Sequence, residues 1–303
     1  MIMDPQPGES VYDPTCGSGG LLLNCALHLK DEGKEYRTLK LYGQEINLLT
    51  SAIARMNMFM HGIEEFSIVR GDTLARPAFL HNDALKTFNV ILANPPYSIK
   101  AWDQKGFAND PYGRNLWGIP PQGCAFQQHI QKSLDENNGR SISLWPHGVL
   151  FRDSESEMRR KMIEQDVVEC VISLGPNLFY NSSMTSCLLI TNNNKKPERK
   201  GKVLFVQAVN EVRNEKTISY LDPQHIERIH NAYLTFANED TFTAVVDNDE
   251  ILKDNNVRLS VQLFVKQDKI EEEEFDLLLG QWEQSLDSLK NSMNELFKTL
   301  ANG

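Results

Sequence analysis

The sequence predicts an α/β fold: a doubly wound, mostly parallel, Rossmann-like sheet followed by a C-terminal helical appendage. Two observations support this prediction. Short apolar runs alternate with stretches of helical periodicity, which is typical of βαβ units. The end of the chain instead carries apolar residues at 4-3 spacing, which indicates a separate amphipathic helix. We therefore expect a main domain over residues 1–200, an α/β extension of it over 201–265 and a helix for partner docking over 266–303.

The first predicted strand, residues 11–13, ends in a glycine-rich turn over residues 14–20. Gly17 and Gly19 let the backbone of this turn come close to a ligand. Asp13 departs from the dinucleotide-binding pattern, because a carboxylate at that strand end would repel a pyrophosphate. A cofactor with a cationic or hydroxyl-bearing end fits better. S-adenosylmethionine has both.

Two further strands end in carboxylates. Residues 39–45 end in Glu45, which can accept hydrogen bonds from ribose hydroxyls, and residues 67–72 end in Asp72, which can receive an adenine amino group. Taken alone, each carboxylate is more typical of a helix cap or a solvated turn. Because ligands bind outside the carboxyl ends of the strands in an open α/β sheet, the series of strand ends favours a shared cofactor site.

A helix is predicted between these two strands. Asn47 can cap its start and Gly62 can end it. It would run through Leu48, Ala52, Ile53, Met56, Phe59 and Met60, and we expect its methionines and its phenylalanine to lie in the core. The later predicted elements are helices over 126–134 and 154–163 and strands over 141–145, 167–174 and 185–191.

The fourth strand, residues 88–93, is followed by Asn94-Pro95-Pro96-Tyr97. The prolines stiffen the backbone, so the Asn94 amide oxygen and nearby carbonyls are held rigidly at the sheet edge. Such acceptors suit a planar exocyclic amino group, and Tyr97 offers a face on which a base can stack. The alternative is that these residues form only a strand-ending turn.

The order of these two motifs resembles the N6-adenine DNA methyltransferase (modification) subunit of type I restriction-modification systems. The residues that match are Asp13-Pro14-Thr15-Cys16-Gly17-Ser18-Gly19-Gly20 and Asn94-Pro95-Pro96-Tyr97. Weaker matches are Tyr42-Gly43-Gln44-Glu45, Ala54-Arg55-Met56-Asn57, Gly71-Asp72-Thr73-Leu74, the run from Trp145 to Phe151 and Asn177-Leu178-Phe179-Tyr180. The resemblance runs from Gly8 to about Val265.

This resemblance implies that residues 1–200 are an S-adenosylmethionine-dependent methyltransferase domain, which methylates N6 of an adenine flipped out of DNA. The implied catalytic residues are Asn94, Pro95, Pro96 and Tyr97. The implied cofactor-binding residues are Asp13, Thr15, Cys16, Gly17, Ser18, Gly19, Glu45, Asp72 and Asn94, with no metal. The implied partners are DNA, a specificity subunit and a second methyltransferase subunit, with a restriction subunit as a further candidate.

Other functions stay open. Asn94-Pro95-Pro96-Tyr97 by itself also resembles protein-glutamine and RNA-guanine methyltransferases. A non-catalytic assembly subunit with the same fold is a further alternative, because the family has an N-terminal helical domain that we expect this chain to lack. The segment from Ser98 to Gly123 is rich in glycine, proline and aromatic residues, and we expect it to be a lid on the substrate side.

Composition is consistent with a cytoplasmic enzyme. No apolar run is long enough to span a bilayer, and no signal peptide is visible. The five cysteines lack Cys-x-x-Cys spacing and the seven histidines are scattered, so we expect reduced thiols and no metal site. The net charge of −10 is unfavourable for binding DNA alone, but residues 271–303 hold eight acidic and two basic side chains and so carry most of it.

The C-terminal segment follows a heptad pattern. Its a and d positions are Phe275, Leu279, Trp282, Leu286, Leu289, Met293, Leu296 and Leu300. A single helix cannot bury this stripe by itself. We prefer docking on a partner helix to folding back on the main domain, although Gly280 weakens the prediction of one continuous helix.

Overall fold

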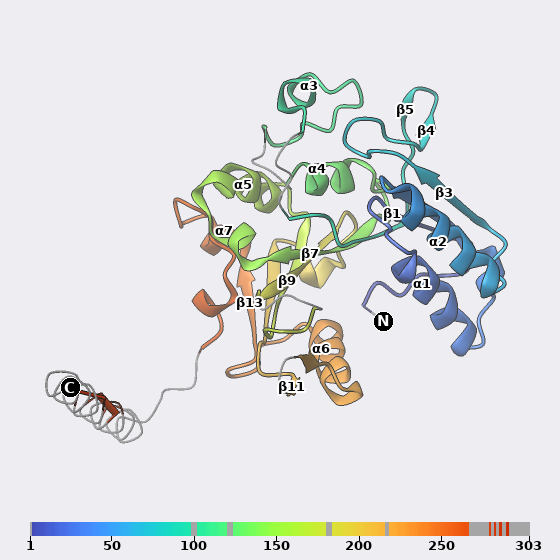
Figure 1. The fold of residues 1–303 in the computed structure, drawn as a ribbon. Coiled ribbons are helices and arrows are strands. Elements are labelled where there is room, and N and C mark those ends of the chain that lie inside the picture. Colours follow the sequence, from blue (N-terminus) through green and yellow to red (C-terminus); the bar gives the residue numbers. More distant parts are fainter. Residues whose placement is uncertain are drawn as a thin grey trace, which may run out of the picture. The chain divides into compact units, whose positions relative to one another are not determined.

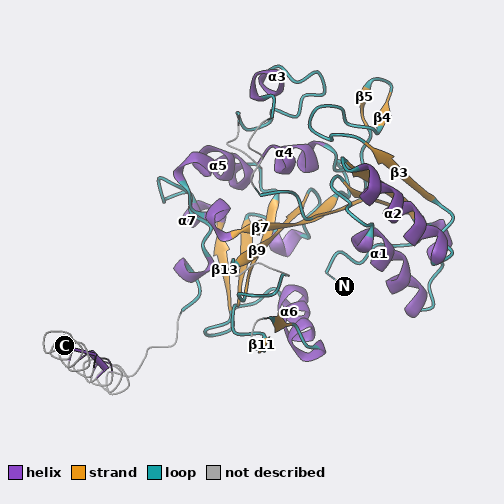
Figure 2. Cartoon of the chain, in the orientation of Figure 1, coloured by secondary structure: helices purple, strands orange, loops and turns teal. Residues whose placement is uncertain are grey.

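The computed structural model describes residues 2–97, 102–119, 124–179, 184–215 and 218–266, together with six helical residues of the C-terminal segment: Leu279, Trp282, Ser285, Leu286, Leu289 and Lys290. The chain divides into two compact units, Met1–Lys266 and Gln267–Gly303. The first unit is built on a nine-stranded sheet with helices on both faces (Figures 1 and 2). The doubly wound α/β prediction is therefore confirmed.

The strand order in the sheet is β13-β10-β8-β9-β7-β6-β1-β2-β3. These strands are β1 (Ser10–Asp13), β2 (Lys40–Glu45), β3 (Phe66–Arg70), β6 (Val90–Ala93), β7 (Arg140–Pro146), β8 (Val168–Leu174), β9 (Ser186–Asn192), β10 (Lys202–Ala208) and β13 (Thr243–Asp247). β9 is antiparallel to both neighbours and β13 is antiparallel to β10, whereas the other neighbouring strands pair in parallel.

Helices cover both faces of the sheet. They are α1 (Gly20–Asp31), α2 (Leu48–Met60), α3 (Gln104–Ala108), α4 (Ala125–Lys132), α5 (Ser156–Glu164), α6 (Pro223–Thr235) and α7 (Asn248–Ile251). Residues of α1, α2 and α6 share one hydrophobic core with one face of the sheet, and residues of α4, α5 and α7 share a second core with the other face. Two short hairpins, β4 (Leu80–His81) with β5 (Ala84–Leu85) and β11 (Arg213–Asn214) with β12 (Ser219–Tyr220), lie outside the main sheet.

The predicted elements agree with the structure to within two residues at most ends. Helices α4 and α5 correspond to the helices predicted over 126–134 and 154–163. Strands β7, β8 and β9 correspond to those predicted over 141–145, 167–174 and 185–191. The sequence predicts residues 201–265 only as an α/β extension and gives no separate bounds for β10, α6 and β13. It also gave no position for β9, which lies between β7 and β8 in the sheet although it follows both in the chain.

The prediction for the side chains of α2 is wrong. Asn47 caps this helix by accepting a hydrogen bond from the Thr50 backbone N–H, as expected, but the helix buries only Ser51, Ala54 and Met58. Its other large apolar side chains are exposed, with Leu49 at 71% and Met60 at 74% of their accessible surface. The helix packs through Ser51, Ala54 and Met58 and leaves its other large apolar side chains on the outer surface.

The C-terminal segment is described only in part. Leu279, Trp282, Leu286 and Leu289 of the predicted stripe are helical, whereas Phe275, Met293, Leu296 and Leu300 lie outside the described residues. Trp282 is 60% exposed and Leu289 is 58% exposed. No helix in the described part of the chain is long and apolar enough to cross a membrane.

Candidate functional site

The carboxyl ends of β6, β1, β2 and β3 meet at one edge of the sheet, because these strands are neighbours and run in the same direction. A cavity of about 390 Å³ opens at this edge. Five predicted site residues line it: Thr15, Glu45, Asp72, Asn94 and Pro96. Ile46, Trp102 and Phe126 also line the cavity and add apolar side chains to it. Trp102 belongs to the segment that the sequence predicts to be a lid, whereas no role in the site is predicted from the sequence for Ile46 or Phe126.

The glycine turn after β1 approaches the next strand closely. The Cys16 backbone N–H donates to the Gln44 carbonyl oxygen at 2.9 Å. Gly19 has a φ of +81°, and a Cβ atom built there would lie 2.9 Å from the Met58 Cε atom. The positive φ favours glycine here, and any other residue would also force the Met58 methyl group to move. The Cys16 side chain is buried, and burial raises the pKa of its thiol, so Cys16 contributes its backbone rather than a reactive sulfur.

Glu45 links the turn to the cavity. Its Oε2 atom accepts from the Gly17 N–H at 3.0 Å and its Oε1 atom accepts from the Asn47 N–H at 2.8 Å. A carboxylate has about four acceptor sites. Two therefore remain for hydroxyl groups of a ligand in the cavity.

Asp13 does not line the cavity. Its side chain is buried below the turn, where Oδ1 accepts from the Thr15 backbone N–H at 2.9 Å. Burial raises the pKa of this carboxyl group to about 7, and the nearby Glu45 charge adds to the shift. The structure therefore gives Asp13 a bond that shapes the turn, while Thr15 presents its side chain at the cavity wall.

The loop after β3 is held by residues that sequence reasoning did not single out for this purpose. Asp72 folds back and its Oδ1 atom accepts from the Leu74 and Ala75 N–H groups. The Thr73 hydroxyl donates to the Pro14 carbonyl oxygen at 2.6 Å, which ties this loop to the glycine turn. Gln44 is buried and bonds the backbone of residues 76 and 78, which fixes the far side of the loop.

Arg114 ties the same loop to the segment after Asn94-Pro95-Pro96-Tyr97. Its guanidinium donates to the carbonyl oxygens of Thr73 at 2.9 Å and Leu74 at 2.8 Å, and forms a buried ion pair with Asp110. Of residues 102–119, Trp102 lines the cavity. The sequence gives one signal for this pair: Asp110 and Arg114 are four positions apart in a segment rich in glycine and proline.

Asn94-Pro95-Pro96-Tyr97 lies at the rim of the cavity. Asn94 and Pro96 are exposed, Pro95 is buried and Tyr97 is half-buried. The Tyr97 hydroxyl donates to the Asn94 Oδ1 atom at 3.0 Å. Burial also raises the pKa of Tyr97, so the hydroxyl stays protonated and keeps its role as a donor.

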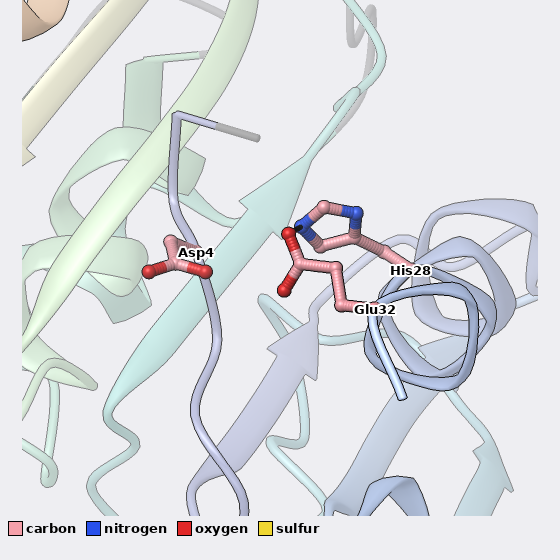
Figure 3. A group of neighbouring side chains, drawn as sticks. All are labelled: Asp4, His28 and Glu32. Carbon is pink, nitrogen blue, oxygen red and sulfur yellow. Dashed lines mark ion pairs between the residues drawn. The ribbon is translucent and has the colours of Figure 1, made fainter. Parts of the chain in front are cut away.

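Figure 3 shows one group of possible metal ligands, Asp4, His28 and Glu32, whose ligand atoms all lie within 4.8 Å of one another. Lys34 Nζ lies 2.7 Å from a Glu32 oxygen and 3.7 Å from an Asp4 oxygen. An ammonium group therefore already neutralises these partly exposed carboxylates. The group also lies at the end of α1 that is far from the glycine turn.

Comparison with known proteins shows the family to which the chain belongs. A family model described as N-6 DNA Methylase matches residues 1–273. The chain belongs to the N-6 DNA methylase family. It is similar to the type I restriction enzyme MjaVIII methylase subunit of Methanocaldococcus jannaschii, with 31% identity over 99% of this chain and 52% of that protein. The MpnII methylase subunit of Mycoplasma pneumoniae is 32% identical over 95% of this chain and 54% of its own length.

Solved structures agree with this assignment. The methyltransferase subunit of a type I restriction-modification system from Streptococcus thermophilus has a TM-score of 0.78 and 32% identity, and covers 87% of this chain and 55% of its own. The N-6 DNA methylase chain described here thus has the class I fold of S-adenosylmethionine-dependent methyltransferases. It spans about half the length of the curated relatives that it matches.

The buried Asp13 predicts a pH dependence of stability. Folded Asp13 keeps its proton up to about pH 7, whereas the unfolded chain releases it near the ordinary value of 3.8. The folded state therefore binds more protons between about pH 4 and 7, and this group makes stability fall as the pH rises through that window.

Asp13→Asn keeps an acceptor for the Thr15 N–H and removes the titration. We expect its melting temperature, relative to that of the unmodified chain, to rise between pH 5 and pH 8. Thermal unfolding followed by circular dichroism at several pH values measures this difference. A constant difference across the range would contradict the raised pKa.

Proposed function

We propose that this chain is the methyltransferase part of a type I modification enzyme, which transfers a methyl group from S-adenosylmethionine to N6 of an adenine in DNA. One observation carries the proposal. Asn94, an acceptor suited to an exocyclic amino group, lies at the rim of a cavity whose other polar walls, Glu45 and Asp72, suit an adenosine. The family and the similar type I methylase subunits support the same reading.

The cavity fits the proposed cofactor. Its volume lies within the range of small-molecule sites, roughly 300–1,000 Å³. Glu45 would hold the ribose hydroxyls, Asp72 the adenine amino group, and Ile46 with Phe126 the faces of the ring. S-adenosylmethionine, when bound, supplies an electrophilic methyl group.

The chain would contribute to methyl transfer by positioning the target amino group. The Asn94 amide oxygen and the Pro95 carbonyl oxygen would accept hydrogen bonds from the two N–H groups of the target amine, so that its nitrogen lone pair points toward the cavity. Tyr97 would stack on the base. Catalysis by orientation and fixed acceptors needs no covalent intermediate on the protein.

DNA and other subunits are the proposed partners. The net charge of −10 does not favour DNA binding by the chain alone, because contacts to phosphates need lysine and arginine. We therefore assign base recognition to a specificity subunit, alongside a second methyltransferase subunit and a candidate restriction subunit. A similar solved structure comes from work on complex assembly of the type I restriction-modification system. The helical residues Trp282, Leu286 and Leu289 would dock on such a partner.

The first prediction concerns the cofactor. Glu45→Ala should weaken S-adenosylmethionine binding by about 1.5–3 kcal/mol, the scale of a hydrogen bond to a charged group. Isothermal titration calorimetry on the full chain measures the change. Glu64→Ala removes an exposed carboxylate away from the cavity and is the matched control. Equal affinity in a folded Glu45→Ala variant would rule out the ribose role.

The second prediction concerns the chemistry. Asn94→Ala should lower methyl transfer to DNA by about two orders of magnitude, as expected for the loss of one well-placed polar group in a transition state. Cofactor binding should persist. Transfer of a tritiated methyl group to unmethylated duplex DNA is measured with the chain assembled with its specificity subunit. Asn231→Ala on α6 is the control, and near-normal turnover of Asn94→Ala would refute the mechanism.

The third prediction concerns assembly. Leu286→Asp combined with Leu289→Asp should abolish binding to the specificity subunit, because two charges would be placed in an apolar helix contact. The melting temperature of the first unit should change little. Leu234→Asp on α6 places a charge on an exposed apolar position and is the control. Intact assembly, measured by size-exclusion chromatography with light scattering, would argue against docking through this stripe.

A further inference from the structure

The Asn94 carboxamide makes one hydrogen bond to another side chain among the residues that the structure describes. This contact is the hydrogen bond from the Tyr97 hydroxyl to Oδ1 at 3.0 Å. Asn94 is otherwise exposed at the cavity rim. Its orientation therefore depends on a single neighbour, which belongs to the same four-residue motif.

Orientation matters because a carboxamide has two different ends. The terminal torsion of asparagine is broad and roughly two-fold, so an unrestrained side chain exchanges its oxygen and its NH2 group at little energetic difference. In one orientation the oxygen faces an incoming amino group and accepts from it. In the other orientation an NH2 group faces the incoming amino group, and two donors oppose each other.

The geometry of the motif suits a fixed contact. Pro95 and Pro96 restrict the backbone between the two residues, so Asn94 and Tyr97 keep their relative positions. The Tyr97 ring is half-buried against the two main hydrophobic cores, which holds the hydroxyl in place. An amide oxygen has two lone pairs, so Oδ1 can accept from Tyr97 and still accept from a substrate.

We propose that the Tyr97 hydroxyl is a positioning group that holds the Asn94 carboxamide with its oxygen available to the amino group of the substrate. The inference rests on the proposed function and deepens it: the ring of Tyr97 would receive the base, and its hydroxyl would act through Asn94. It also restricts the substrate to one that presents a hydrogen-bond donor at this point, which an exocyclic amine does.

Tyr97→Phe tests the hydroxyl because it keeps the ring. With the full chain assembled with its specificity subunit, we expect single-turnover methyl transfer to unmethylated duplex DNA to fall about 3- to 10-fold, the scale of one neutral hydrogen bond. The KM for DNA and the affinity for S-adenosylhomocysteine should stay unchanged. Tyr97→Ala should raise the KM for DNA as well, because it removes the stacking face.

Tyr233→Phe is the matched control. It also removes a buried hydroxyl that donates a hydrogen bond, in this case to Glu169 at 2.6 Å, but far from the cavity in the fold. We expect this variant to change the melting temperature without changing the rate of methyl transfer at a temperature where it is folded. A general loss of packing or stability would affect both tyrosine variants alike.

A double-mutant cycle separates positioning from a direct contact with the substrate. Asn94→Asp replaces the carboxamide with a group whose two oxygens are equivalent, so its rotation no longer exchanges acceptor for donor. In that background Tyr97→Phe should change the rate less than 2-fold. The same loss in both backgrounds would overturn the proposal, because the hydroxyl would then act independently of Asn94.

The outcomes also separate this inference from the proposed function. If the unmodified assembly transfers methyl groups to DNA and Tyr97→Phe is equally fast, the positioning role is wrong and the function stands. An increased KM for DNA with an unchanged rate would also overturn the positioning role, since the hydroxyl would then bind the substrate. If the unmodified assembly transfers no methyl groups to DNA, both proposals fail.

Discussion

Parallel pairing of β6, β1, β2 and β3 is the constraint on which the site depends, because it brings four chain segments that are far apart in sequence to the same edge of the sheet. Asp13 pairs with Gly43 and Glu45 with Arg70, so β2 and β3 end level and β1 ends two residues earlier. Asp13 and Glu45 end their strands, and Asp72 and Asn94 follow theirs within two residues, so all four lie at this edge. The cavity forms where these ends diverge into their loops.

The loops around the cavity are held by polar side chains that are themselves buried. Arg114 and Asp110 are almost completely removed from water, which would be costly for an isolated pair of charges. Additional hydrogen bonds from Arg114 to two backbone carbonyls, and to Asp110 from backbone N–H groups, offset this cost. The segment that follows Asn94-Pro95-Pro96-Tyr97 is thereby attached to the loop that carries Asp72. Cofactor and target base would meet across one shared wall.

Local patterns in the sequence predicted the strand ends well, because an apolar run that stops at a carboxylate or an asparagine is visible within a few residues. The hydrogen bonds that Gln44, Thr73 and Arg114 make to backbone groups could not be predicted from such local patterns. Their partners are backbone groups of other loops, and no local pattern specifies a backbone carbonyl 40 residues away. The position of β9 between β7 and β8 likewise depends on pairing between strands that are distant in the sequence.

The error in α2 has a different cause. Helical periodicity shows that apolar residues share a face, but it does not show which face the rest of the protein covers. Here the residues that face the rest of the protein are Ser51, Ala54 and Met58, which lie on one side of the helix. The larger residues are left outside, where hydrophobic patterns would not place them.

Ala54 and Met58 of α2 lie so close to Gly19 that the packing of this helix limits which residue the glycine turn can hold. A Cβ atom at position 19 would lie 2.9 Å from Met58 Cε and 3.4 Å from Ala54 Cβ. A protein interior is packed so densely that an added methyl group forces its neighbours to move. The inner face of α2 therefore constrains the sequence of a turn whose Gly17 N–H is bonded to Glu45.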